Sequence, residues 1–183
     1  MYYRLNDNLE EYRNYIISEE SKSNFSKEFY MDVFDGRSFK DGYKTCEFVM
    51  TVKEEKDYPL ADIWFGSIPV CSKRAKEVIE SISDESEVEF LPCKLEGVEE
   101  QYYIFNILGS EDCVDYEKSK FQRFSSSGRI MFFEHIEFNQ EVNRHFFRIE
   151  DLKRGYFFVN KETKEKLEKA GLKGLVFDNS LFN

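Results

Sequence analysis

The chain has 183 residues, of which 41% are hydrophobic and 17% aromatic, and it carries a formal net charge of −10 with an isoelectric point near 4.9. This content of large apolar side chains argues against an intrinsically disordered protein. The length suits one domain or two small, intimately packed lobes, and we expect a single domain over residues 1–183. The acidity disfavours binding to nucleic-acid phosphates, and no apolar run approaches the length of a membrane-spanning helix.

The first sixty residues predict mainly strands and loops. The run CEFVMTV at residues 46–52 is rich in aromatic and β-branched side chains, which favour a strand. Leu9, Tyr12 and Ile16 recur at helical spacing, which favours a short helix. We expect strands at residues 1–5, 29–34 and 46–52, a short helix at residues 6–17 and a polar loop at residues 18–26.

Residues 68–91 predict a strand, a helix and a second strand. Short apolar runs at residues 68–70 and 88–91 are typical of buried strands. Between them, Ser72 can cap a helix over residues 73–82, whose apolar side chains share one face. The aromatic run QYYIFNIL at residues 101–108 then predicts a central strand of the sheet.

Seven carboxylates stand against one lysine between residues 84 and 100. Glu87 and Glu89 flank Val88 in the expected strand, so we expect them to share an outward face. One interpretation is a solvated sheet edge whose charges prevent aggregation, and the charges alone favour it. The other interpretation is a docking surface for a basic protein, formed by Asp84, Glu85, Glu87, Glu89, Glu96, Glu99 and Glu100.

The C-terminal third predicts a second strand-helix-strand unit. Asn160 can cap a Lys- and Glu-rich helix at residues 161–170, and Gly171 stands where a left-handed residue would end it. The other expected elements are an acidic segment at residues 112–119, a turn at 124–128, and strands at 129–138, 145–149, 156–159 and 175–177. The whole pattern predicts an α+β fold of mixed or mostly antiparallel sheets with a few short helices, including two strand-helix-strand units.

The two units share a spacing of apolar anchors. Val70 and Val78 in the first unit are as far apart in the chain as Val159 and Leu167 in the second. An internal repeat would explain this, but short apolar patterns also coincide by chance, and we favour a common β-α-β plan.

Three segments carry a resemblance to a known family. They are DIWFGSIPVCSKRAKEVIE at residues 62–80, YYIFNILGSEDCVDYEKSKF at residues 102–121, and FFRI followed by GYFFVNKETKEKLEKAGLKGLVFD within residues 146–178. Together they are similar to the bacterial polymorphic-toxin immunity proteins of family eleven, over residues 62–178. Residues 1–61 match nothing that we can name, and we expect them to pack on this domain. The resemblance implies an α+β fold, a neighbouring toxin gene, and a cognate toxin protein as the partner.

The sequence shows no pattern of a catalytic or cofactor site. The four cysteines form no CxxC pair, and we expect free thiols in a reducing cytoplasm, since the first residues also lack a signal peptide. His135 and His145 lie in aromatic runs without a third ligand, so we expect no metal, and phosphate-binding glycine motifs are absent. A Cys–His nucleophilic pair stays open, because its members need only meet in space. Trp64, the only tryptophan, is either core or an interface anchor, and we favour core.

Three hypotheses follow for the function. The first, implied by the resemblance, is a toxin-neutralising immunity protein that acts by binding, is not an enzyme, and needs no cofactor, nucleic acid or membrane. The second is a small ligand-binding protein or enzyme whose pocket is built from His135, His145 and nearby carboxylates. The third is a scaffold domain without a toxin partner.

Overall fold

The computed structural model describes residues 1–8, 10–24, 35–41, 43, 45–50, 58–66, 68–152 and 156–183, and these form an α+β fold. The strands are β1 (Tyr2–Asp7), β2 (Tyr15–Ile17), β3 (Cys46–Met50), β4 (Ile63–Trp64), β5 (Val70–Ser72), β6 (Val88–Leu95), β7 (Tyr102–Ile107), β8 (Lys120–Arg123), β9 (Ile130–His135), β10 (Phe146–Phe147), β11 (Phe158–Asn160) and β12 (Leu175–Asp178). The helices are α1 (Glu19–Asn24), α3 (Lys73–Glu80) and α4 (Lys161–Ala170), with 3₁₀ turns η1 (Glu150–Leu152) and η2 (Ser180–Phe182).

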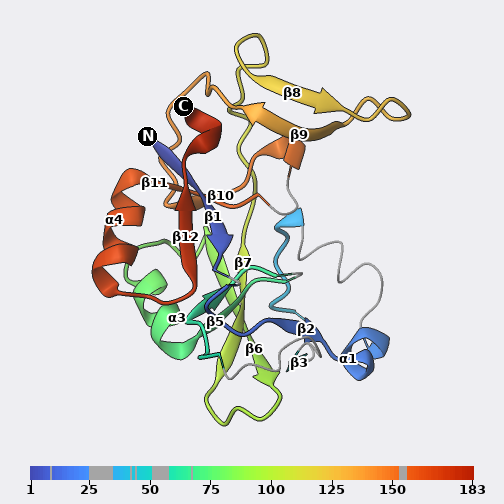
Figure 1. Ribbon diagram of the computed structural model, residues 1–183, viewed down its shortest axis with the longest axis vertical. Helices are drawn as coiled ribbons and strands as arrows, with labels where there is room; N and C mark the ends of the chain where they lie inside the picture. Colours follow the sequence, from blue (N-terminus) through green and yellow to red (C-terminus); the bar gives the residue numbers. More distant parts are fainter. Residues whose placement is uncertain are drawn as a thin grey trace.

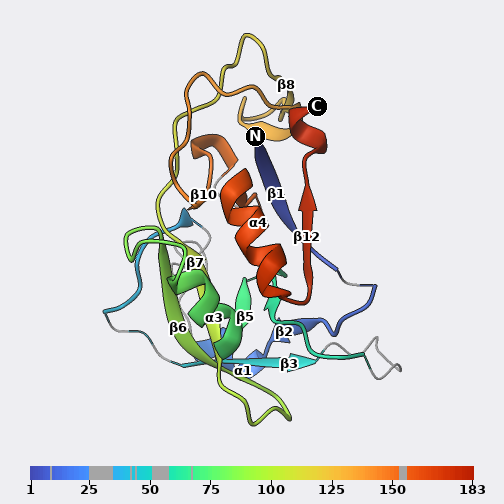
Figure 2. The ribbon, with the colours of Figure 1, turned by 90° about the vertical axis from the view of Figure 1, so that its left-hand side faces the viewer.

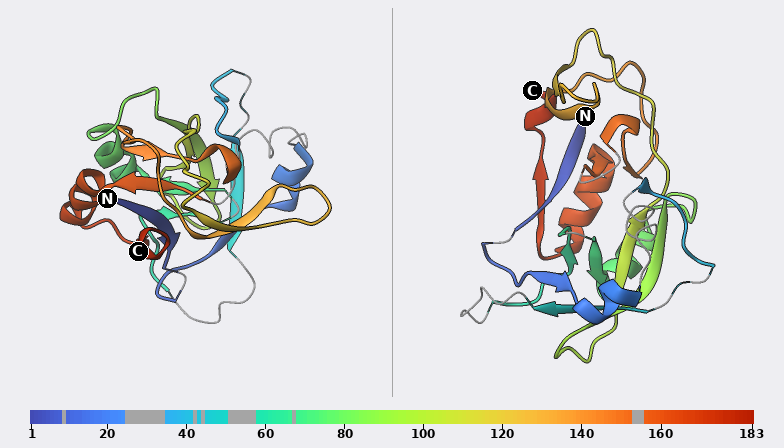
Figure 3. Two further views of the ribbon diagram at one scale, coloured as in Figure 1. Left: turned by 90° about the horizontal axis from the view of Figure 1, so that it is seen from above. Right: turned by 90° about the vertical axis from the view of Figure 1, so that its right-hand side faces the viewer.

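The strands form three sheets within the described residues (Figure 1). The large sheet has the order β2-β3-β6-β7-β5-β4 and is antiparallel except for the β3–β6 pair. The small sheet has the order β10-β11-β1-β12 and is antiparallel throughout. Strands β8 and β9 form a separate hairpin, which we call the arm (residues 120–135). The arm projects from one end of the molecule, opposite the end where the β6–β7 hairpin projects (Figures 1 and 3).

The two predicted strand-helix-strand units are confirmed, and they have the same topology. In the first, β5 and β6 lie on either side of β7, and α3 connects them. In the second, β11 and β12 lie on either side of β1, and α4 connects them. The predicted caps are also present: the Ser72 and Asn160 side chains accept hydrogen bonds from the N–H groups of Ala75 and Thr163. The chain places both connecting helices on the same side of the molecule (Figure 2).

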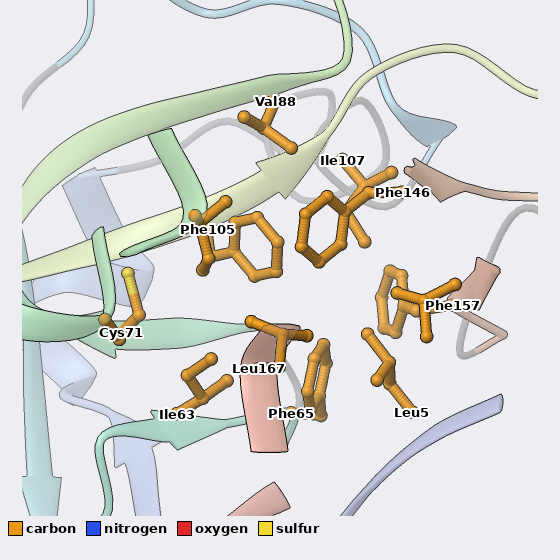
Figure 4. Packing of buried hydrophobic residues seen from close by; sticks show 13 residues of the cluster. Leu5, Ile63, Phe65, Cys71, Val88, Phe105, Ile107, Phe146, Phe157 and Leu167 are labelled. Carbon is orange, nitrogen blue, oxygen red and sulfur yellow. The ribbon is translucent and has the colours of Figure 1, made fainter. Parts of the chain in front are cut away.

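One of three apolar clusters among the described residues lies between the two sheets and the two helices (Figure 4). The small sheet contributes Leu5 and Val159, and β7 contributes Phe105 and Ile107. Leu167 of α4 packs into the same cluster and is only 1% exposed. Strand β1 is an interior strand of the small sheet, between β11 and β12. The N-terminal residues are therefore part of this architecture and not an addition at its surface.

A polar junction also joins the two units. The Asp62 carboxylate accepts hydrogen bonds from Ser72 Oγ (3.0 Å), from the Lys173 N–H (2.9 Å) and from Arg74, whose Nη1 lies 2.9 Å away. Arg74 Nη2 also donates to the carbonyl of Ala170, at the last turn of α4 (2.5 Å). One arginine at the start of α3 therefore satisfies the end of α4.

Two predictions in the N-terminal region are wrong. The described residues of 6–17 do not form a helix, because Tyr15 and Ile17 are buried and Ile16 is exposed, which is the alternation of strand β2. Residues 19–24 form helix α1 where we expected a loop. The Ser18 side chain accepts a hydrogen bond from the Ser21 N–H (3.1 Å), and two acidic residues occupy the first turn. The strand expected at residues 29–34 lies outside the described residues.

Several residue-level expectations are confirmed. Trp64 is core, 5% exposed, and its ring meets Tyr15 and Phe48 edge-on. The four cysteines are buried and free. The strand expected at residues 145–149 is shorter, since only residues 146–147 pair in the sheet. Among the described residues, no helix has the length and apolarity to cross a membrane.

Candidate partner-binding surface

The seven acidic residues proposed as a docking surface lie on β6 and its two flanks, but they do not form one surface. Glu87 and Glu89 are buried, at 7% and 1% exposed, so the expectation that they share an outward face is wrong. As predicted, side chains two residues apart along β6 share one face of the strand. However, the alternate positions on the same face are Leu91, Cys93 and Leu95, which are all buried in the core of the large sheet.

Glu89 belongs to a buried polar network. Its carboxylate accepts hydrogen bonds from the Phe39 N–H (2.9 Å), from Ser38 Oγ (2.7 Å) and from Asn106 Nδ2 (3.0 Å). Asn106 lies directly opposite Glu89 in the β6–β7 register and also donates to the carbonyl of Arg37 (2.7 Å). The segment at residues 37–39 therefore covers this end of β6, and Glu89 holds it there.

The network continues to Arg148, which is completely buried. Its Nε donates to the Ile107 carbonyl (2.8 Å), its Nη2 lies 3.4 Å from Asn106 Oδ1, and its guanidinium stacks over the Phe157 ring. Burial lowers the pKa of Arg148 to about 10, and the nearby negative charge of Asp35 opposes that change. Arg148 therefore stays charged at neutral pH, with the half-buried carboxylate of Asp35 nearby.

Glu87 connects the two sheets. Its carboxylate accepts hydrogen bonds from the N–H groups of His145 (3.1 Å) and Phe146 (3.3 Å), at the start of β10. The Nδ1 atom of His145 lies 3.5 Å from the same carboxylate. Like Glu89, Glu87 is occupied by contacts inside the protein, so it is not available to a partner.

The other five acidic residues are exposed and form two patches. Glu96, Glu99 and Glu100 lie at the projecting tip of the β6–β7 hairpin, and within the described part of the chain none of them forms an ion pair. The tip is anchored, because the Glu96 N–H donates to the Phe48 carbonyl (2.8 Å) and Val98 packs against the core. We call these three residues the acidic tip.

The second patch is at the other end of β6. Asp84 and Glu85 line a hollow of about 260 Å³ together with Glu80, but Lys76 pairs with Glu80 (2.7 Å) and Lys40 also lines the hollow. The eight residues of β6 separate this patch from the acidic tip, and a strand of this length spans about 23 Å. Among the described residues, two lysines line the hollow beside Asp84 and Glu85, whereas no ion pair involves the acidic tip.

The structure does not support a pocket built from the two histidines. His135 is on the arm, 3.6 Å from Glu137, whereas His145 lies beside Glu87 and lines a different hollow of about 300 Å³. The described residues contain no group of three or more side chains placed to hold a metal ion. Burial raises the pKa of the Cys46 and Cys113 thiols to about 12, so neither is an activated nucleophile at neutral pH.

Sequence reasoning missed two features of this protein. The first is the network of Glu89, Asn106 and Arg148, for which the available signal was a polar residue inside each of three apolar runs. The second is a set of exposed apolar side chains on and beside the arm, Tyr116, Phe124 and Met131. Periodicity did not separate those three from the buried aromatic residues around them.

Comparison with known proteins identifies a family. A family model described as an immunity protein family, Imm11, matches residues 2–180. The match therefore begins sixty residues before the resemblance that we found in the sequence and includes β1, β2 and β3. No curated protein matches the chain.

Proposed function

The chain belongs to the immunity protein family Imm11, and on that premise we propose that it neutralises a cognate bacterial toxin by binding to it. In this role it is a stoichiometric inhibitor and not an enzyme. The partner is the toxin protein, not a nucleic acid or a membrane. We place the complex in the cytoplasm, where the four free, buried thiols stay reduced.

The observation that carries the proposal beyond family membership is the acidic tip. Three carboxylates project together on an anchored hairpin of a protein whose net charge is −10. A negative projection attracts a basic surface on the partner and raises the association rate. The exposed residues proposed to contact or attract the toxin are Asp84, Glu85, Glu96, Glu99 and Glu100.

The test uses the toxin domain that we expect to be encoded beside the gene of this chain. Calorimetric titration of the purified toxin domain with the wild-type protein is expected to show one-to-one binding, and the toxin is expected to lose its activity at the same ratio. Absence of binding by the wild-type protein would overturn the proposed function.

Charge reversal at the acidic tip tests the surface. The triple variant Glu96→Lys, Glu99→Lys and Glu100→Lys is expected to slow association roughly 10- to 100-fold at low salt. The matched control reverses three exposed carboxylates of α4, Glu162, Glu165 and Glu168, and produces the same net charge. If both variants slow association equally, the effect belongs to the net charge and not to the acidic tip.

A further inference from the structure

Strand β12 forms an open edge of the small sheet. It pairs with β1 on one side only, and it runs along the outside of the molecule (Figures 2 and 3). Two other sheet edges are covered by the chain itself. The Phe146 N–H of β10 donates to Glu87 (3.3 Å), and the Ile63 N–H of β4 donates to the Lys173 carbonyl (3.2 Å). Within the described residues, β12 has no such cover.

The register of β1 and β12 determines which backbone groups of β12 point outward. The Asn8 N–H donates to the Gly174 carbonyl (3.0 Å), so these two residues form a hydrogen-bonded pair. Such pairs alternate along an antiparallel ladder, and Val176 is therefore bonded to β1 as well. Leu175 and Phe177 turn their N–H and C=O groups to the open side, where no partner for them is found among the described residues.

The side chains of this strand leave the edge unprotected. Val176 is 39% exposed on one face, and Leu175 and Phe177 are half-buried on the other face, where they pack against the cluster between the sheets. Natural edge strands avoid pairing with other chains through lysine, proline or a bulge. Strand β12 contains neither residue type, and its register with β1 has no irregularity.

From this edge we propose that the chain forms a homodimer in which the β12 strands of two copies pair antiparallel, with the two-fold axis at Val176. Leu175 of one copy then lies opposite Phe177 of the other, and each donates its N–H to the carbonyl of its opposite residue. The two-fold axis repeats this pair, so four hydrogen bonds satisfy every outward group of the two strands. The small sheets join into one continuous sheet.

The side chains also match under this symmetry. The two Val176 side chains meet at the axis, in a non-hydrogen-bonded position where side chains lie closest. On the other face, Leu175 packs beside Phe177 of the other copy, which extends the apolar cluster of each copy across the contact. Asp178, the charged residue of the strand, lies toward Gly174, which has no side chain, and its carboxylate already accepts from the Ser180 N–H (2.8 Å).

Charge favours a second copy over a basic partner at this edge. Residues 161–180 contain five lysines and four carboxylates, a net charge of 5 − 4 = +1, so the rest of the chain carries −10 − 1 = −11. Two acidic copies therefore repel each other least when this segment faces its own equivalent. A basic toxin surface is attracted to the acidic tip and not to this edge.

Sedimentation velocity over a range of protein concentrations tests the dimer. Because the contact is small, we expect Kd on the order of 10 to 100 µM. Val176→Lys places two like charges together at the axis and is expected to stay monomeric up to about 300 µM. The matched control is Ile16→Lys, which adds the same charge at a residue 38% exposed on the edge strand β2 and is expected to dimerise like the wild type. Circular dichroism and melting temperature check that both variants fold.

Hydrogen exchange of the wild-type protein identifies the contact without a substitution. The Leu175 and Phe177 amides are expected to exchange fast in dilute protein and at least about ten-fold more slowly above the dimerisation Kd. The Val176 amide, which is bonded to β1, is expected to exchange slowly at both concentrations.

The inference is independent of the proposed function, because neither measurement uses the toxin. A wild-type protein that stays monomeric at about 300 µM would overturn it. So would a dimer that leaves Leu175 and Phe177 unprotected, or one that Ile16→Lys disrupts and Val176→Lys does not. If these two amides became protected only on addition of the toxin domain, the edge would belong to a toxin strand and the dimer would be excluded. Each copy keeps its own acidic tip, so the one-to-one ratio with the toxin is unchanged.

Discussion

Glu89 and Glu96 carry the same charge and lie seven residues apart, yet their environments are opposite. Glu89 is 1% exposed and accepts hydrogen bonds from two segments, whereas Glu96 is exposed at the turn that follows β6. The cost of burying a carboxylate is offset at Glu89 by hydrogen bonds from Ser38, Phe39 and Asn106. A carboxylate in a strand is therefore a surface candidate only when its own face of the strand is exposed.

Asp7 shows how burial changes the pKa of a single carboxylate and, through it, the stability of the fold. Its carboxylate accepts a hydrogen bond from the Phe65 N–H, but burial dominates and raises its pKa to about 6 from the ordinary 3.8. Because the folded state holds the proton more tightly, this group favours the folded state most below pH 4. That contribution is lost as the pH rises through 6, and it amounts to at most about 3 kcal/mol.

We expect Asp7→Asn to raise the free energy of unfolding at pH 7 by about 1 to 2 kcal/mol, because the amide keeps an acceptor for Phe65 and removes the buried charge. The variant should also lose the part of the stability change between pH 4 and 6 that belongs to Asp7. Urea unfolding at several pH values measures both effects, with the exposed Asp112→Asn as the control. A less stable Asp7→Asn protein at pH 7 would show that the charged hydrogen bond outweighs the cost of burial.

At the scale of elements, the fold is two split β-α-β units joined at their helices. In each unit a strand from elsewhere in the chain, β7 or β1, occupies the position between the two strands that the helix connects. Each helix follows its first strand without a loop, and a side-chain cap starts it. The shared topology agrees with a common β-α-β plan, which also explains the equal spacing of the apolar anchors.

Arg74 is the side chain that couples the two units. It pairs with Asp62 and donates to the last carbonyls of α4, at Ala170 and Gly171. We expect Arg74→Ala to lower the free energy of unfolding by about 1 kcal/mol, and the melting temperature by about 2 to 4 °C, because the end of α4 loses its donor. The control is Lys73→Ala, which removes one exposed ion pair at 4.0 Å.

Amide hydrogen exchange shows which part of the structure the Arg74→Ala substitution destabilises. In Arg74→Ala the amides of Gly171 and Lys173 should exchange faster than in the wild-type protein, while those of α1 stay unchanged. Equal exchange at α4 in both proteins would mean that Arg74 does not hold the end of the helix.

For the whole molecule, we propose that residues 1–183 form one cooperative unit. The cluster between the sheets contains side chains of both sheets and of both connecting helices. Strand β1 lies between β11 and β12, so the first residues of the chain are paired with some of the last. Neither sheet can lose its contacts without exposing the apolar face of the other.

Two probes test this unity. Fluorescence of Trp64, the only tryptophan, reports on the core of the large sheet, and circular dichroism at the helical minimum reports mainly on α3 and α4. We expect the two unfolding midpoints in urea to coincide, and we expect a chain that begins at Asp62 not to fold, since it lacks β1. Two separate transitions would show that the sheets unfold as independent lobes.

The sequence by itself determined the elements whose signals are local. Helix α4 has the predicted bounds because Asn160 caps its start and Gly171, with a φ of +62°, ends it. Helix α3 starts at the predicted cap, and the α+β class and both strand-helix-strand units follow from periods of two and 3.6 residues. The resemblance in residues 62–178 was likewise visible in the sequence, although the family match is longer.

Only the tertiary structure decided what covers each face. Periodicity places Glu87 and Glu89 on one side of β6, but their burial depends on residues 37–39 and 145–146, which approach from distant parts of the chain. The order of strands around β1, the buried position of Arg148 and the exposure of Phe124 and Met131 depend on such long-range contacts as well. The physical reason is that a local pattern fixes which side chains point the same way, whereas their environment is set by whatever else packs against that side.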